Sequence, residues 1–253
     1  MKKIVLAVIV ALSFTSCAEL LQVANTLGTS SSALPVTEAE NELGLKSSLN
    51  VGIDNAVNLL GVENGFYNDA ILRLVLPEEA QPIIKNIKLI PGGQELVNKA
   101  VLSLNRSAED AVKEATPIFK KAIKSMTIKD VAGILFGGNY AATNYLKEKT
   151  YTDLEAAFAP KVKISLEKPL VGNVSTTKSW NSLTSAYNQV ANNPFGAVAG
   201  LKPVNVNLEQ YVTQKALDAL FIKVAAEEKS IRTDPIARVS AILKRVFGQL
   251  DKK

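Results

Sequence analysis

The chain has 253 residues, 47% of them hydrophobic, with 29 Lys and Arg against 24 Asp and Glu, no histidine and a single cysteine. Because imidazole is the usual general base near neutral pH, this composition excludes Ser-His-Asp and Cys-His catalysis and the ordinary zinc sites. Carboxylate pairs, Ser-Lys arrangements and all-oxygen cation sites stay open. Lys and Arg do not cluster with aromatic residues, so we expect no nucleic-acid partner. No pattern in the sequence points to a cofactor or a bound metal.

The first 17 residues follow the layout of a bacterial lipoprotein signal. Lys2 and Lys3 precede an apolar run over residues 4–12, and small residues lead to Cys17. The run has about 10 residues, too few for the ~20 that cross a membrane as a helix. The position of Cys17 resembles a lipobox, although Phe14 replaces the usual Leu. A plain secretory signal with a chance cysteine is the alternative interpretation.

We therefore expect residues 1–16 to be removed as a signal peptide and Cys17 to carry the lipid that holds the protein on a membrane. Residues 17–36 then form a lipidated, flexible tether, and residues 37–253 form a single helical domain. This places the protein in the cell envelope. Ala18, rather than Asp, after the cysteine favours the outer membrane, with the domain facing the periplasm.

The first predicted helix runs from Thr37 to about Leu60. Thr37-Glu38-Ala39-Glu40 has the pattern of a capping box, and apolar residues follow at steps of three and four. Residues 61–91 are interrupted by Gly and Pro. A long helix is predicted over residues 94–126, with a bend or break at Pro117.

Further helices are predicted in the second half of the chain. They cover residues 127–136, 139–149, 152–167, 177–191, 207–233 and 235–247, with a loop over residues 192–205. The sequence shows neither strand alternation nor an internal repeat. The predicted fold class is therefore all-α, a multi-helix bundle that follows the signal peptide and tether.

The predicted helix over residues 207–233 carries the first candidate site. Residues 216–226 are apolar in nearly every direction, which is typical of a helix inside a bundle. Projection at about 100° per residue places Gln214, Lys215, Asp218 and Arg232 in one sector. Because buried charges need partners, these residues form either an internal salt-bridge network, which is the simpler interpretation, or the wall of a ligand pocket.

A second candidate lies in the predicted helix over residues 94–126. Asn105 and Glu109 are four positions apart on one face, and Arg106 lies beside them. These three residues could form a cation or anion site. An ordinary helix surface is the simpler interpretation, because such pairs are common contacts within helices.

Several segments together resemble a known bacterial family. They are residues 137–143 (Gly-Gly-Asn-Tyr-Ala-Ala-Thr), residues 210–218 (Gln-Tyr-Val-Thr-Gln-Lys-Ala-Leu-Asp) and residues 226–235, which contain Ala-Glu-Glu-Lys. Residues 65–68 and 104–109 also fit. In this order, over about residues 43–250, they resemble the family called domain of unknown function 4197. The resemblance implies an exported helical domain without an established activity. It selects seven positions for testing: Arg106, Glu109, Lys149, Lys215, Asp218, Glu227 and Arg232. Together with Asn105 and Gln214 from the helix patterns, they form the candidate polar cluster.

The main functional hypothesis is an uncharacterised, membrane-anchored envelope lipoprotein with a non-enzymatic binding or structural domain. Its partners would be the membrane, through the lipid on Cys17, and an envelope protein or an amphipathic ligand. Carriage of an apolar ligand would need a cavity of at least about 300 Å³ between the helices.

The alternative hypothesis is a hydrolase or lyase that acts on envelope glycan or lipid. Asp218, Glu109 or Glu227 would then be the acid or base, with Lys residues assisting. This alternative requires two carboxylates from different helices to meet in a cleft, roughly 5–10 Å apart for glycoside chemistry.

Overall fold

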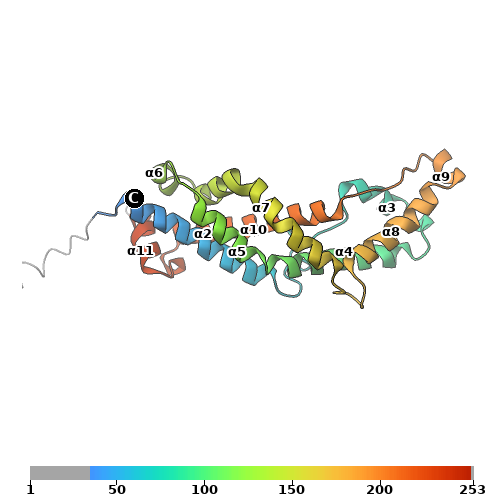
Figure 1. The fold of residues 1–253 in the computed structure, drawn as a ribbon, viewed down its shortest axis with the longest axis horizontal. Helices are drawn as coiled ribbons and strands as arrows, with labels where there is room; N and C mark the ends of the chain where they lie inside the picture. Colours follow the sequence, from blue (N-terminus) through green and yellow to red (C-terminus); the bar gives the residue numbers. More distant parts are fainter. Residues whose placement is uncertain (1–34, 252–253) are drawn as a thin grey trace, which may run out of the picture. The chain divides into compact units, whose positions relative to one another are not determined.

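The computed structural model describes residues 35–251. The chain from Val36 onward forms one compact unit of packed helices, without a β-strand among the described residues, which confirms the predicted all-α class. Figure 1 shows the α-helices, which are α2 (Glu38–Leu60), α3 (Gln81–Lys85), α4 (Gly93–Val112), α5 (Ala115–Ser125), α6 (Val131–Leu135), α7 (Ala141–Glu167), α8 (Thr176–Ala191), α9 (Pro194–Val198), α10 (Leu208–Thr233) and α11 (Ala241–Phe247). Short 3-10 helices are η1 (Glu78–Ala80), η2 (Ile87–Leu89), η3 (Pro235–Ala237) and η4 (Gly248–Asp251).

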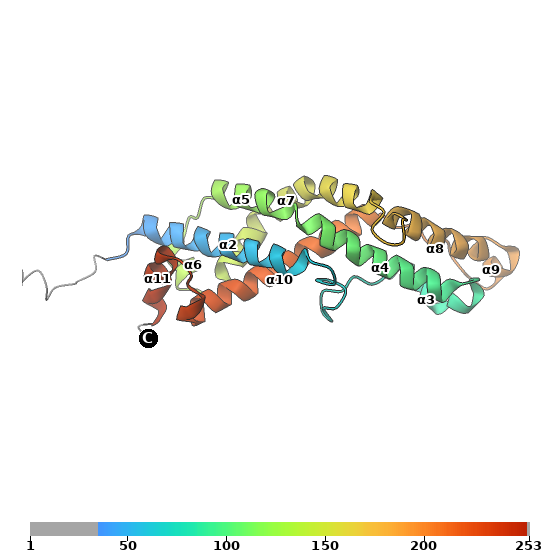
Figure 2. The ribbon, with the colours of Figure 1, turned by 90° about the horizontal axis from the view of Figure 1, so that it is seen from below.

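α10 is the central helix of this unit. It packs against α2 and α7 and also contacts α4, and Ala216, Leu217 and Leu220 are fully buried. Gly52 lets α2 approach α10 closely, because a Cβ atom at this position would lie only 3.0 Å from Cγ1 of Val224. Figures 1 and 2 show α10 running alongside α2. The prediction of an apolar, central helix over residues 207–233 is therefore confirmed.

The remaining helices gather at the two ends of the bundle. α6 and α11 pack against α2, whereas α8 packs against α4 and contacts α9. Both views place α11 and the start of α2 at the end opposite to α9 (Figures 1 and 2). The start and the end of the described chain therefore meet.

The predicted break near Pro117 is confirmed. α4 ends at Val112 and α5 begins at Ala115. The helices separate ahead of Pro117 because a proline ring clashes with the carbonyl group four residues earlier, here that of Lys113.

The prediction of separate helices over residues 139–149 and 152–167 is wrong, because α7 runs without a break through Thr150, Tyr151 and Thr152. Weak helix preference at such residues costs only tenths of a kcal/mol, so packing overrides it. Tyr151 stacks on Phe221 of α10, and the Thr150 hydroxyl donates to the Leu146 carbonyl inside the helix.

The predicted final helix over residues 235–247 is also wrong in its extent. Pro235 starts only the short η3, and α11 begins after Ser240, which caps it. The chain turns between them because the guanidinium of Arg238 is buried and donates to the Ile231 and Arg232 carbonyls at the end of α10. The predicted loop over residues 192–205 also contains a short helix, α9.

Residues 1–34, which include the predicted signal peptide, Cys17 and nearly all of the tether, lie outside the described residues. Within residues 35–251, none of the helices has the length and apolar character needed to cross a membrane.

The predicted capping box at the start of α2 is confirmed, and it is extended by a contact with α11. Glu40 accepts a hydrogen bond from the Thr37 backbone N–H at 2.8 Å and another from the Arg245 side chain at 2.8 Å. The hydrogen bond from Arg245, together with the one from Thr37, lowers the pKa of the Glu40 carboxyl from 4.5 to about 2.

We predict that Glu40→Gln reduces the loss of stability in acid. A lowered pKa stabilises the fold above pH 4.5, and this contribution disappears as the pH falls toward 2. Urea unfolding between pH 6 and pH 2 should therefore show a shallower pH dependence for Glu40→Gln than for the unchanged chain. Glu38→Gln, in the same helical turn but outside these contacts, is the control and should keep the original dependence. Identical curves for the unchanged chain and Glu40→Gln would contradict the prediction.

Candidate functional site

The most deeply buried charges of the described chain are Glu228 and Arg232, one helical turn apart on α10. Their side chains are 0% and 2% exposed, and they form an ion pair at 2.8 Å. Glu228 also accepts hydrogen bonds from the backbone N–H groups of Ala142 and Thr143, at 2.9 and 2.7 Å, and from the Thr143 hydroxyl at 2.6 Å. The carboxylate therefore caps the start of α7, where the Tyr140 side chain provides no cap.

Arg232 binds the end of another helix. Its guanidinium donates to the carbonyls of Leu135 at 2.6 Å and Ile134 at 3.0 Å, in the last turn of α6. An acid at a helix N-terminus and a base at a C-terminus both match the helix dipole. The Glu228–Arg232 pair thus satisfies unpaired backbone groups at the adjoining ends of α6 and α7.

Sequence analysis selected Glu227, whereas the buried carboxylate is its neighbour Glu228. Glu227 is only partly buried. One signal could have identified Glu228: it lies four residues before Arg232, the spacing at which Glu and Arg pair on a helix. The sequence alone does not indicate that the pair would face the ends of α6 and α7.

Asn105, Arg106 and Glu109 hold the segment after α2 against α4. Asn105 pairs through its side-chain amide with both backbone groups of Leu74, and its Nδ2 also donates to the Val101 carbonyl. Glu109 accepts from the backbone N–H groups at positions 66 and 67 and from Arg106. Arg106 donates in addition to side chains at positions 63 and 64. Asn105 and Glu109 are buried, so the interpretation as an ordinary helix surface is wrong. Their hydrogen bonds serve the fold.

The four residues predicted to share one sector of α10 separate into three environments. Gln214 donates to Glu155, and Asp218 pairs with Lys147 at 2.8 Å, both across the contact with α7. Lys215 is exposed above the Tyr211 ring and, together with Asp218, lines a groove between α10 and residues 71–81. Arg232 is buried at the far end of the helix. Gln214 and Asp218 form a half-exposed polar contact between α7 and α10, and Asp218 shares the groove with Lys215.

Tyr151 completes that contact, since its hydroxyl lies 3.3 Å from Asp218. Burial, together with the nearby Asp218 charge, raises the pKa of the Tyr151 phenol to about 12. Lys149 lies apart on the exposed side of α7 and pairs with Glu148, whose hydrogen bond raises the pKa of the Lys149 ammonium group. The candidate polar cluster is therefore spread over several places, and its nine residues do not line one pocket.

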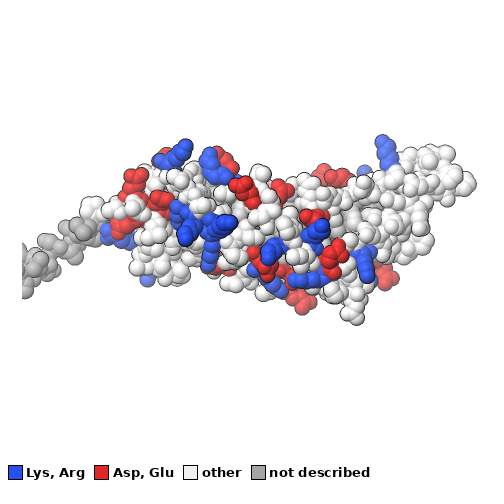
Figure 3. Space-filling view, viewed as in Figure 1, with Lys and Arg blue, Asp and Glu red and all other residues white. Residues whose placement is uncertain are grey.

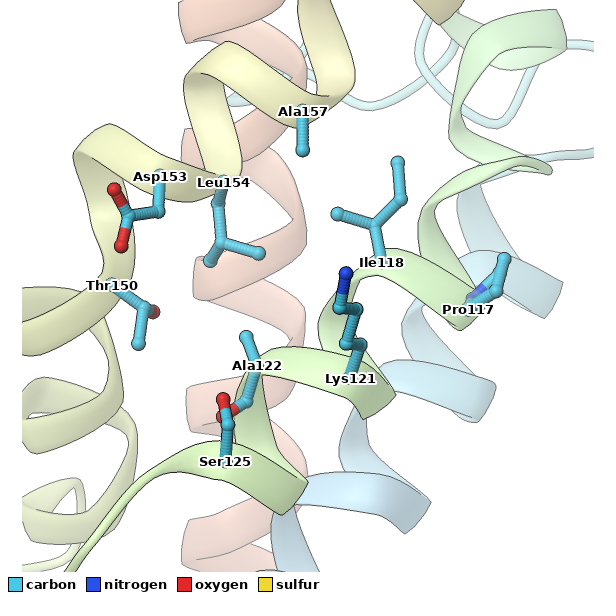
Figure 4. A pocket seen from close by; sticks show the side chains of 9 residues that line it. All are labelled: Pro117, Ile118, Lys121, Ala122, Ser125, Thr150, Asp153, Leu154 and Ala157. Atoms are coloured by element: carbon cyan, nitrogen blue, oxygen red, sulfur yellow. The ribbon is translucent and has the colours of Figure 1, made fainter.

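A groove between α5 and α7 offers a better binding site. Its walls are apolar and its volume is about 560 Å³. Figure 4 shows α5 contributing Pro117, Ile118 and Ala122, which face Leu154 and Ala157 of α7 across the groove. Small alanine side chains on both helices leave this space open. We call it the α5–α7 groove.

The polar groups of the α5–α7 groove lie at its edge. They are Lys121 and Ser125 on α5 and Thr150 and Asp153 on α7. In Figure 4 the Lys121 side chain extends from α5 toward Ile118, whereas the Asp153 carboxylate points away from α5. A ligand with an apolar body and an anionic head matches this arrangement. Sequence analysis missed the groove because it arises from the angle between two helices.

No group of three or more Asp, Glu, His or Cys residues within residues 35–251 is arranged to hold a metal ion.

The chain matches one family of known proteins over most of its length. Residues 35–248 match the family described as "Protein of unknown function (DUF4197)". The chain belongs to this family. The match confirms the resemblance predicted over about residues 43–250. No curated protein and no solved structure gives a match.

In this DUF4197 domain, the segments that carry the family resemblance meet in pairs. Ala142 and Thr143 bind Glu228, and residues 66 and 67 bind Glu109. Both sets of hydrogen bonds join a helix end or a loop to α10 or α4.

We predict that Glu228→Gln strongly destabilises this DUF4197 domain. The substitution leaves the Arg232 charge buried without its counter-ion, which costs about 3–5 kcal/mol of the free energy of unfolding. Urea unfolding followed by circular dichroism measures the change.

The matched control is Glu227→Gln, the same substitution at the neighbouring, partly exposed position. It should change the free energy of unfolding by less than about 0.5 kcal/mol. Equal effects of the two substitutions would show that the buried ion pair does not determine stability.

Proposed function

We propose that this protein is a membrane-anchored envelope lipoprotein whose helical domain binds an amphipathic ligand in the α5–α7 groove, without catalysing a reaction. The ligand that fits best is a single acyl chain with an anionic head, such as a long-chain fatty acid. The observation that carries this proposal is the apolar groove itself, with Lys121 at its edge.

The dimensions and lining of the α5–α7 groove support an acyl ligand. A volume of about 560 Å³ exceeds the ~300 Å³ at which small-molecule pockets begin. Ile118 and Leu154 would contact the apolar chain, while the ammonium group of Lys121 would lie near the head. Burial of apolar surface would supply most of the affinity, and the charge would set the orientation.

The proposal of a membrane anchor rests on the signal-peptide layout of residues 1–16 and on Cys17. Several acyl chains on one cysteine bind a membrane far more strongly than a single myristoyl chain, which gives only reversible attachment. A lipid-anchored domain works where amphipathic molecules are concentrated. The sorting signal at Ala18 supports the outer membrane, with the domain facing the periplasm.

The alternative of a carboxylate-dependent hydrolase or lyase receives less support. Glu109 is engaged by Arg106 and two backbone N–H groups, and Asp218 is paired with Lys147. These contacts neutralise two of the three carboxylates on which that mechanism would depend, and the third, Glu227, is only partly buried. Binding is therefore the function that the geometry favours.

We predict that Ala157→Trp blocks the α5–α7 groove. The indole would fill the space between α5 and α7 and should raise the Kd for a fluorescent long-chain fatty acid by at least about tenfold, or 1.4 kcal/mol. Fluorescence titration measures the affinity.

Ala156→Trp is the matched control, because Ala156 is also exposed on α7 but does not line the groove. It should bind the fatty acid with the affinity of the unchanged chain. Equal affinities of the two tryptophan variants would remove the groove as the binding site.

A further prediction concerns the anchor. Cys17→Ser removes the thiol that would carry lipid, so the protein should lose incorporation of labelled palmitate and leave the membrane fraction. Mass spectrometry of the unchanged protein should show a mature chain that begins at Cys17 and carries acyl chains. An unmodified Cys17 in that spectrum would refute the lipoprotein assignment and leave the groove proposal untouched.

A further inference from the structure

The end of the bundle that carries α9 has an apolar surface without charge. Residues 179–201 contain no Asp, Glu, Lys or Arg. Phe195 and Val198 of α9 are 85% and 91% exposed, and Leu89 of η2 is 54% exposed. Figure 3 shows this end of the visible face almost free of charged side chains, in contrast to the rest of that face. We call the surface formed by Leu89, Phe195 and Val198 the α9 end.

Backbone contacts of α9 hold Phe195 and Val198 in their exposed positions. Asn193 caps α9 by accepting a hydrogen bond from the Phe195 N–H at 3.0 Å, and the Leu201 N–H donates to the Gly196 carbonyl at 3.0 Å. A Cβ atom at Gly196 would lie 2.1 Å from the Val190 carbonyl oxygen, so glycine lets α9 pack directly on the end of α8. Phe195 and Val198 are consequently held outward.

The α9 end is one surface built from two distant segments. Leu89 and Pro91 line the same groove as Phe195 and Leu201, with a volume of about 590 Å³. Leu89 and Phe195 are thus presented together, and Val198 lies three positions after Phe195 on α9. Exposed apolar surfaces of this kind mark sites that bind a partner or a membrane.

Exposed lysines adjoin this apolar surface in the sequence. Lys85 and Lys88 lie in the segment that ends at Leu89, and Lys202 follows the uncharged residues 179–201; all three are exposed. An apolar centre with lysines at its edge fits the interface of a bilayer, where apolar groups enter the acyl boundary and lysines bind anionic headgroups. The charge pattern therefore favours a lipid surface over a protein partner.

We propose that the α9 end binds the surface of a lipid bilayer that contains anionic headgroups. Phe195, Val198 and Leu89 enter the boundary between headgroups and acyl chains, while Lys85, Lys88 and Lys202 contact the headgroups. This contact depends neither on lipid at Cys17 nor on a ligand in the α5–α7 groove.

The test places a fluorescent reporter at the α9 end of the full chain. Phe195→Trp is mixed with vesicles of phosphatidylglycerol and phosphatidylcholine whose acyl chains are brominated, because bromine quenches only tryptophan that enters the bilayer. We expect roughly half of the added emission to be lost, since interfacial segments lie about 5–10 Å into the boundary. Trp180 is 5% exposed, so the unchanged chain supplies the background.

Ile236→Trp is the matched control, because Ile236 is 88% exposed but lies in η3, outside the α9 end. Its added emission should not be quenched. Replacing Lys85, Lys88 and Lys202 by Gln in the Phe195→Trp chain should weaken quenching in the anionic vesicles. Equal quenching of the Phe195→Trp and Ile236→Trp chains would overturn the proposal, and so would an absence of quenching in both. Quenching that survives the loss of all three lysines would overturn the role of anionic headgroups.

Discussion

The ion pair between Glu228 and Arg232 is the constraint on which the arrangement of the helices depends. Removal of two charges from water costs several kcal/mol for each ion, and the attraction between them repays this only when their remaining hydrogen-bonding groups are also satisfied. Here the partners are backbone groups at the start of α7 and the end of α6. A shift of either helix along α10 would leave a buried charge without partners. The pair therefore fixes the register of α6 and α7 on α10.

The same principle operates at other sites in the fold. Glu109 and Asn105 bind the backbone of residues 66–74 to α4, and Arg238 satisfies the last carbonyls of α10 while it pairs with Asp251. Many of the polar and charged side chains that the sequence offered as candidate site residues instead form hydrogen bonds that join helices and loops. The two surfaces that we propose for partners, the α5–α7 groove and the α9 end, are apolar at their centres. Under these proposals, recognition would rely on shape and apolar burial, with lysines at the edges.

The sequence predicted the helical elements better than it predicted the site. Local signals sufficed for the Thr37 capping box, the break ahead of Pro117 and the apolar character of α10, because each depends on neighbouring residues. Local signals failed at Thr150–Thr152, where they predicted a break, because contact with Phe221 overrides weak helix preference. They also failed at Arg238, where they predicted a continuous helix, because the buried contacts of Arg238 turn the chain. Projection of the α10 residues around the helix axis could not show that Asp218 and Arg232 lie in different environments. Asp218 contacts α7, whereas Arg232 contacts α6. The α5–α7 groove depends on the approach of two helices and leaves no local pattern.

The contact between α2 and α11 also limits the order in which the chain can fold. Glu40 binds Arg245, and Asn41 accepts a hydrogen bond from Gln249, across more than 200 positions of sequence. Contacts between residues so distant in sequence form late, because the intervening chain must first be brought together. A chain that emerges from a ribosome or a membrane channel with its N-terminus first cannot complete this packing until its last residues are free. The packing of α2 against α11 is consequently one of the last steps available to a chain that is made from its N-terminus.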